Sequence, residues 1–434
     1  MRSFNQFLSV VLLSSLSLLP RSADAGNAWY ATPFPVSERT AIMGAGSGHS
    51  FVEAMLMGVQ GFSGILAPPE KVYDLLEKCA TATVDAKAWF NGCNADGMKT
   101  VLLAEYKKNN IPQNWVPTGY PNTVDGQMAA IRSMLTCVVT HKSPTIIPLY
   151  GQADHWATIH QVYGDPNVSP KVVSRVRFYD PGGPASKAEL INIDNPENDG
   201  FDYMGYEYME GQKDINLMQL KDEYFKLFQP EPAQMFVDPA YKDQYLVICE
   251  PPLAPKMHKD NDFVFAAPVS VIGEDEVMTS DLASDLVFDA LDIEGYLDDP
   301  EWKYVAAAGV ADDAHMVSWT LPDGRGARYF LVPILDMHTG DTLAHVHFNA
   351  ANGTVARTLL LANPSPLAYI DATMAERSAR TRLRKGEVLV NAGTMLKWDP
   401  LCGNDTCRSP DRPYFEFSAT GGRSGARKFV VPLF

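Results

Sequence analysis

The feature that most constrains the fold is a change in the spacing of apolar residues near residue 140. Before that point, apolar side chains recur three and four positions apart, which predicts helices at residues 48–60, 96–106 and 125–138. After it come short runs rich in Ile, Val, Thr and Tyr between Gly, Asp and Pro turns, which predict strands at residues 145–150, 155–163 and 172–179. Helices followed by an antiparallel sheet predict an α+β fold for this part of the chain.

A second, smaller α+β module is predicted from residue 263 to residue 434. The spacing favours one helix over residues 280–296, followed by strands at residues 316–321, 328–335, 342–349, 387–389, 414–418 and 428–434. Residues 191–262 are rich in acids, Pro and Tyr and have weak periodicity, so we expect an insertion or linker there. The first domain then covers residues 26–190.

Residues 1–25 follow the pattern of a secretory signal peptide. Arg2 precedes an apolar run at residues 7–19, and Ala23 and Ala25 offer small side chains at the cleavage site. The run is shorter than the roughly 20 residues that a transmembrane helix needs. We therefore expect a secreted or periplasmic protein without a membrane span.

The charge of the chain limits its partners. The formal net charge is −16, and such a surface repels phosphate backbones and anionic lipid headgroups. We expect no nucleic-acid partner, and no signal for an oligomeric state is present.

All six cysteines follow the predicted signal peptide. An even number in an exported chain indicates disulfides, and six cysteines allow 15 connectivities. Short loops favour Cys79 with Cys93 and Cys402 with Cys407, which leaves Cys137 for Cys249. No Cys-x-x-Cys pair is present to hold zinc.

The most specific segment is PTIIPLYGQADHWATIHQVYGD at residues 144–165, followed by RFYDPGG at residues 177–183. This pattern resembles the bacteriocin-processing branch of the papain-like cysteine peptidases, also called double-glycine peptidases, over roughly residues 40–185. The resemblance implies a papain-like domain that acts on peptides, with His155 as general base and Asp180 as the acid that orients it. Adjacent antiparallel strands can place these two side chains together, whereas the side chain of Asp154 points to the opposite sheet face. The alternative is that His155 is a strand residue packed on a core.

The nucleophile departs from the family pattern. The resemblance implies a cysteine at the start of the first helix, but residues 46–56 contain none. Ser50 is the best match for that position and Ser47 is the second. A hydroxyl is a poorer nucleophile than a thiolate, and no glutamine stands five or six residues upstream to serve as the family's oxyanion-hole donor. Ser50 and Glu53 can equally form a helix capping box.

Two functions therefore stay open. One is a peptidase-like hydrolase or acyl-transfer enzyme, intact or degenerate, with Ser50, His155 and Asp180 as its catalytic residues. The other is a non-catalytic binding or inhibitory protein that recognises peptides or proteins in the same cleft. Neither function requires a cofactor.

His345 and His347 alternate on one face of a predicted strand and could ligate a metal. With no third ligand nearby in the sequence, a solvated pair is the favoured interpretation, and we expect no metal.

Overall fold

The structure is a computed structural model, and its backbone is described over most of the chain after residue 115. The described residues are 28–31, 95, 99–100, 103–104, 107, 116–140, 145–151, 156–165, 169–179, 185–191, 203–208, 211–228, 241–249, 263–273, 275–320, 326–391, 395–399, 410–421 and 426–434. The predicted signal peptide and the helix at 48–60 lie outside them. So do Ser47, Ser50, His155, Asp180 and the cysteines at 79, 93, 402 and 407.

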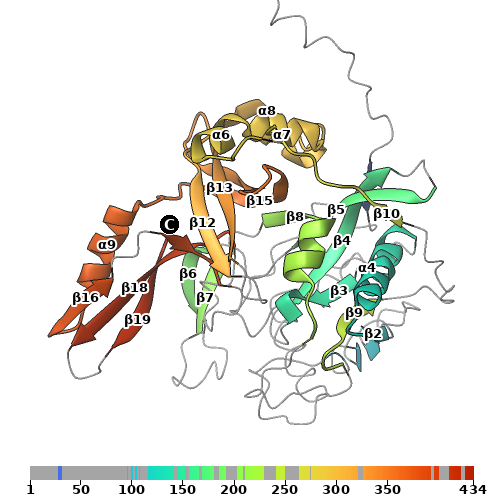
Figure 1. Cartoon of the computed structure of the whole chain (residues 1–434), viewed down its shortest axis with the longest axis horizontal. Coiled ribbons are helices and arrows are strands. Elements are labelled where there is room, and N and C mark those ends of the chain that lie inside the picture. Colours follow the sequence, from blue (N-terminus) through green and yellow to red (C-terminus); the bar gives the residue numbers. More distant parts are fainter. Residues whose placement is uncertain are drawn as a thin grey trace, which may run out of the picture.

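The fold is mixed α/β with one large mixed sheet (Figure 1). Seventeen of the described strands belong to this sheet, and β6 (Ala185–Ile191) and β7 (Tyr203–Tyr208) form a separate pair. Most neighbours are antiparallel; the parallel pairings among the described strands are β10 with β5 and β12 with β17. Among the described helices, none combines the length and the apolar character needed to cross a membrane.

The first part of the sheet packs on helix α4 (Val124–Val139). Thr123 caps this helix by accepting a hydrogen bond from the amide of Gly126, and the helix buries Ile131, Met134 and Leu135. The strands beside it are β1 (Ala28–Ala31), β2 (Val116–Tyr120), β3 (Thr145–Pro148), β4 (Trp156–Asp165), β5 (Lys171–Tyr179) and β9 (Tyr245–Cys249). The predicted helix and the three predicted strands are confirmed to within about two residues.

A disulfide joins α4 to β9. Cys137 and Cys249 are bonded with their Cα atoms 6.3 Å apart, which confirms the pairing expected from the sequence.

The second part is an antiparallel sheet covered on one face by short helices. Its strands are β11 (Gly309–Ala311), β12 (His315–Thr320), β13 (Gly326–Asp336), β14 (Thr342–Asn349) and β15 (Val355–Ser365). The helices are α6 (Ser280–Asp285), α7 (Val287–Ile293), the 3-10 turn Pro300–Trp302 and α8 (Lys303–Ala308). The single helix predicted at 280–296 is thus two helices, because Leu286 leaves helical geometry with ψ of 2°.

The C-terminal strands extend this sheet. Strand β17 (Leu396–Lys397) pairs with both β12 and β18 (Tyr414–Gly421), and β18 pairs with β16 (Glu387–Asn391) and β19 (Arg427–Pro432). Helix α9 (Ala372–Thr381) packs on these strands. The predicted strands at 387–389, 414–418 and 428–434 are confirmed, whereas α9 and β15 have no counterpart in the prediction.

Strand β8 (Gly211–Asn216) connects the two parts of the sheet. It lies within the segment predicted as an insertion or linker and is followed by the short helices Leu217–Gln219 and Leu220–Tyr224. Ile215 of β8 lies opposite Val176 of β5 on one side and opposite Arg357 of β15 on the other. Strand β10 (Phe263–Phe265) also pairs with β5 (Figure 1).

A buried arginine reinforces this junction. Arg177 on β5 forms ion pairs with Asp214 of β8 and with Asp299, each at 2.6 Å, and with Glu301 at 2.9 Å. Asp299 is itself the cap of the 3-10 turn at Pro300. Charged side chains from three segments, β5, β8 and the turn at residues 299–301, thus pair inside the junction.

Candidate functional site

The three residues predicted to be catalytic, Ser50, His155 and Asp180, lie outside the described residues. The strands that adjoin two of them are described. Strand β4 begins at Trp156, directly after His155, and β5 ends at Tyr179, directly before Asp180. The two strands are antiparallel neighbours, with Thr158 opposite Tyr179.

A buried polar cluster forms where β14, β15 and β8 meet the segment before β18. His345 and His347 on β14 are fully buried, as is Asp411. The expectation of a solvated histidine pair is therefore wrong. Strand β14 is an inner strand between β13 and β15, and Tyr329 holds the segment containing Asp411 over it by donating to the carbonyl of Pro410 at 2.6 Å.

The cluster is a chain of charged and neutral groups. Lys213 Nζ lies 2.9 Å from Asp411 Oδ2, and Asp411 Oδ1 lies 2.7 Å from His347 Nε2. On the other side of the imidazole, Arg357 Nε donates to His347 Nδ1 at 2.7 Å. An arginine can only donate, so Nδ1 is the acceptor and the imidazole proton is on Nε2, facing Asp411.

His345 occupies the second position beside Asp411. Its Nε2 lies 2.7 Å from the Tyr369 hydroxyl, and its Nδ1 lies 4.0 Å from Asp411 Oδ1. Tyr369 in turn contacts the Thr342 hydroxyl at 3.2 Å. The hydrogen bond between Nε2 and the Tyr369 hydroxyl orients this imidazole.

Burial keeps both imidazoles neutral. It lowers the pKa of His345 to about 4 and that of His347 to about 3, and the positive charge of Arg357 acts in the same direction. Burial alone would raise the pKa of Asp411, but the charge of Lys213 and the contact with His347 outweigh it and hold that pKa well below 3.8. At neutral pH the cluster therefore contains one carboxylate and two neutral imidazoles.

The donor set of His345, His347 and Asp411 is of a kind that binds metals, and their ligand atoms lie within 4.8 Å of one another. The surrounding cations argue for a different use. A metal on Nε2 of His347 would move the imidazole proton to Nδ1, where Arg357 already directs an N–H. Lys213 already neutralises Asp411. The residues fit a hydrogen-bond network better than a metal centre.

Arg357 lies at the cavity end of this chain. Its side chain is 3% exposed. Its guanidinium carbon lies 4.8 Å from the ring centroid of Tyr329 and 5.3 Å from that of Trp398. Besides His347, it donates to the hydroxyl of Tyr224. In the described part of the chain, these hydrogen-bond partners are uncharged, and no ion pair joins Arg357 to a carboxylate.

An open cavity of about 1680 Å³ lies in front of Arg357. Its walls come from β12 to β15, from the short helices after β8 and from residues 395–399. Aromatic side chains line it at Tyr245, Trp319, Tyr329, Phe330, Trp398 and Tyr414. Basic side chains line it at Lys221, Lys226, Arg328, Arg357 and Lys397, and acidic ones at Asp222, Glu223, Asp399 and Glu416.

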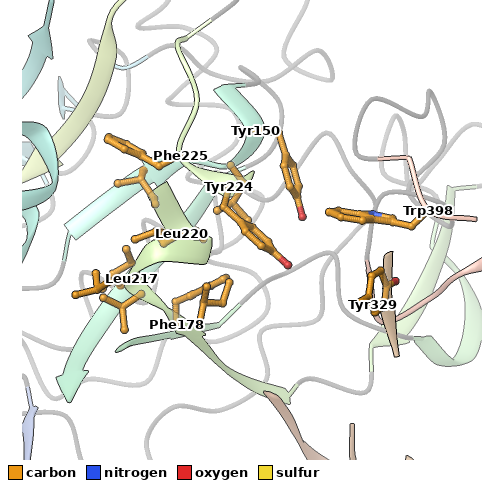
Figure 2. Close-up of a cluster of buried hydrophobic side chains, with 14 of the residues drawn as sticks. Tyr150, Phe178, Leu217, Leu220, Tyr224, Phe225, Tyr329 and Trp398 are labelled. Atoms are coloured by element: carbon orange, nitrogen blue, oxygen red, sulfur yellow. The ribbon is translucent and has the colours of Figure 1, made fainter. Parts of the chain in front are cut away.

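An aromatic group connects the cavity to the core of the first part. The rings of Tyr150 and Tyr224 are 5.1 Å apart, and Tyr150 lies 5.8 Å from Trp398. Figure 2 shows Tyr224 between the apolar cluster around Leu220 and the ring of Trp398. The cavity wall is therefore anchored in packed side chains from both parts of the sheet.

Glu223, which lines the cavity, has a pKa near neutral pH. Burial raises its pKa from 4.5 to about 7, and the charge of Arg357 and a hydrogen bond from Gln219 only partly oppose this shift. A proton bound there alters the charge close to Arg357.

Sequence reasoning identified the two histidines but missed Arg357, Lys213 and Asp411. A usable signal was the single arginine in the apolar run at residues 355–361. A charge in a run of that kind has to be paired or functional.

In comparisons with protein-family models, curated proteins and solved structures, the chain matches none of them.

Proposed function

We propose that this chain is a peptide-binding protein and that peptides occupy the cavity in front of Arg357. The lining of the cavity is the observation that carries the proposal. Small-molecule sites usually enclose about 300–1000 Å³, and this cavity, at about 1680 Å³, has room for several amino-acid residues. Aromatic rings provide apolar contact area, and charges of both signs suit a ligand with mixed side chains.

Peptides also fit the chain better than other polymers. The net charge of −16 disfavours nucleic acids. The similarity of residues 144–183 to peptidases favours a peptide over an oligosaccharide. Among the described residues that line the cavity, none belongs to β4 or β5, the strands that adjoin His155 and Asp180.

The test is a titration of the purified protein with a pool of peptides of about ten residues, followed by tryptophan fluorescence. Trp319 and Trp398 line the cavity and report its occupancy. Ala351 is an exposed residue of the lining, so Ala351→Trp should narrow the cavity and weaken binding at least about tenfold, a loss of roughly 1.4 kcal/mol. Ala306→Trp, on an exposed position of α8 away from the cavity, is the matched control.

A wild type that binds no peptide, or that binds oligosaccharides or single-stranded DNA in preference, would refute the proposal. If Ala306→Trp weakens binding as much as Ala351→Trp does, the loss comes from disturbed folding and not from a narrower cavity.

The second candidate is a papain-like hydrolase with Ser50 as nucleophile, His155 as base and Asp180 as orienting acid. Its support is the register of β4 and β5, in which Thr158 lies opposite Tyr179 at the strand ends that adjoin His155 and Asp180. Hydrolysis of peptide or ester substrates should then be lost in Ser50→Ala, His155→Ala and Asp180→Asn. In Ser50→Cys, the new thiol should react with iodoacetamide at neutral pH and lose this reactivity when His155 is also replaced. An inert wild type with an unreactive thiol would eliminate this candidate.

A further inference from the structure

Arg357 places a positive charge in the interior of the sheet. The described residues around it do not include a carboxylate that forms an ion pair with it. Strand β15 is hydrogen-bonded on both sides, with Arg357 opposite His347 of β14 and opposite Ile215 of β8. Arg357 is 3% exposed and lines the cavity. An unpaired buried cation costs several kcal/mol, so such a residue needs a compensating partner.

The nearby carboxylate, Asp411, is already committed to another cation. It forms an ion pair with Lys213 at 2.9 Å, and His347 separates it from Arg357. Lys213, Asp411, His347 and Arg357 together contain two cations, one anion and one neutral imidazole. Of these four residues, Arg357 is the cation that faces the cavity, and the buried Glu223, whose pKa is raised to about 7, is a further carboxyl close to it.

The geometry of the guanidinium leaves room for an anion. Its Nε and one terminal nitrogen contact His347, and the other terminal nitrogen contacts the Tyr224 hydroxyl. An arginine has five N–H donors, so one N–H on each terminal nitrogen has no acceptor among these contacts. The rings of Tyr329 and Trp398 fix the plane of the group. Two N–H groups held in a plane are the geometry that binds a carboxylate through both oxygens.

We infer that the peptide in this cavity carries a free carboxylate that pairs with Arg357, and that His347 and Asp411 are positioning residues that hold the guanidinium in place. This inference rests on the proposed peptide-binding function and names its ligand class. The ligand carboxylate, either a C-terminus or an acidic side chain, pairs with the guanidinium from the cavity side, where no ion pair joins Arg357 to a carboxylate of the described residues. The other charges of the cavity lining then contact the rest of the peptide.

The experiment compares peptide pools that differ only in their carboxylates. The first pool contains peptides of about ten residues without Asp or Glu and with a free C-terminus; the second is the same pool with an amidated C-terminus. A third pool is amidated and has one Glu at its centre. The wild type should bind the first or third pool at least about tenfold more tightly than the second, because a hydrogen-bonded charge pair is worth that much or more.

Variants assign this preference to Arg357. Arg357→Gln should remove it, and Arg357→Lys should keep only part of it, since an ammonium cannot form the two parallel hydrogen bonds. Arg380→Gln, which removes an exposed arginine on α9 that is not among the residues lining the cavity, is the matched control and should keep the preference. Circular dichroism melting shows whether each variant is folded.

If Arg357→Gln does not fold, competition with sodium acetate tests the carboxylate inference on the wild type alone. Acetate should weaken binding of the carboxylate-bearing pool and leave the amidated pool unaffected; sodium chloride at equal ionic strength is the control. If inorganic phosphate competes much more strongly than acetate, the ligand group is a phosphate and the carboxylate assignment is overturned.

The outcomes distinguish a failure of the carboxylate inference from a failure of the proposed peptide-binding function. Equal affinity of the wild type for all three pools would overturn the carboxylate inference and leave peptide binding in place. A preference that survives in Arg357→Gln would overturn the role of Arg357. No binding of any pool would overturn the proposed function itself.

Discussion

Nε2 of His347 lies 2.7 Å from Oδ1 of Asp411, and both side chains are fully buried. Asp411 is therefore the anion that allows Lys213 to be buried and fixes the tautomer through which His347 accepts a hydrogen bond from Arg357. The stability of this region and the geometry of the proposed peptide site depend on the same carboxylate.

Asp411→Asn should destabilise the protein by about 3–5 kcal/mol, because it removes the carboxylate that forms a buried ion pair with Lys213. The free energy of unfolding in urea at neutral pH measures this loss. Asp371→Asn is the matched control. Asp371 caps the exposed start of α9, and asparagine caps helices about as well as aspartate. A loss in Asp411→Asn no larger than in the control would contradict the assigned role.

Stability should fall as the pH is lowered from about 6.5 towards 4. The pKa values of His345 and His347 are lowered to about 4 and about 3 in the folded state. Their ordinary value of 6.5 applies to the unfolded chain, so the unfolded state binds more protons in this range and acid favours it. Urea denaturation at several pH values should show a smaller pH dependence in the double variant with glutamine at both positions. His338→Gln, at an exposed position, should leave the dependence unchanged.

Arg177→Ala should cost about 3–5 kcal/mol, since it removes the buried cation that pairs with Asp214, Asp299 and Glu301. The comparison is Arg380→Ala. Arg380 is 61% exposed and pairs with Glu376 one helical turn away, so its loss should cost no more than about 0.5 kcal/mol. Similar unfolding free energies for the two variants would mean that Arg177 does not stabilise the junction.

Replacing Cys137 and Cys249 together by serine should lower the unfolding free energy by about 2–5 kcal/mol. The bond closes a loop over a sequence separation of 112, and its loss gives the unfolded chain more freedom. The midpoint of urea denaturation should fall in the double variant, and a reductant should bring the wild type to that level or below it. An unchanged midpoint would show that the crosslink does not restrict the unfolded chain.

Binding of a carboxylate-bearing peptide should strengthen as the pH falls from about 8 to about 6. Burial raises the pKa of Glu223 to about 7, so a proton bound there in this range removes a negative charge near Arg357, whereas a peptide C-terminus with a pKa near 3.5 stays ionised. Calorimetric titration should show a change of up to about tenfold. Glu223→Gln should bind with little pH dependence; a dependence equal to that of the wild type would rule out Glu223 as its source.

Apolar periodicity predicted the elements that bury one clear face. Helix α4 and strand β14 lie almost where the spacing placed them. Strand β8 could not be recognised in this way, because its buried positions include Lys213 and Asp214, each neutralised by a partner distant in sequence. The polar residues that favoured a linker in the sequence include, in β8, the members of a buried ion-pair network.

The site was harder to predict than the fold. Alternation places His345 and His347 on one face of a strand, but it does not say whether that face is covered. Their burial depends on Asp411, which is more than sixty positions along the chain from His347, and on a contact between Tyr329 and Pro410. Such contacts arise only in the folded chain, so no local pattern records them.

Strand β8 has one consequence for any attempt to divide this protein. A fragment that ends at residue 262 would keep β8 but lose β15, and one that begins at residue 263 would keep β15 but lose β8. Each would present a bare strand edge to other molecules, and such edges promote aggregation. The two pieces should therefore be soluble partners only when they are produced together.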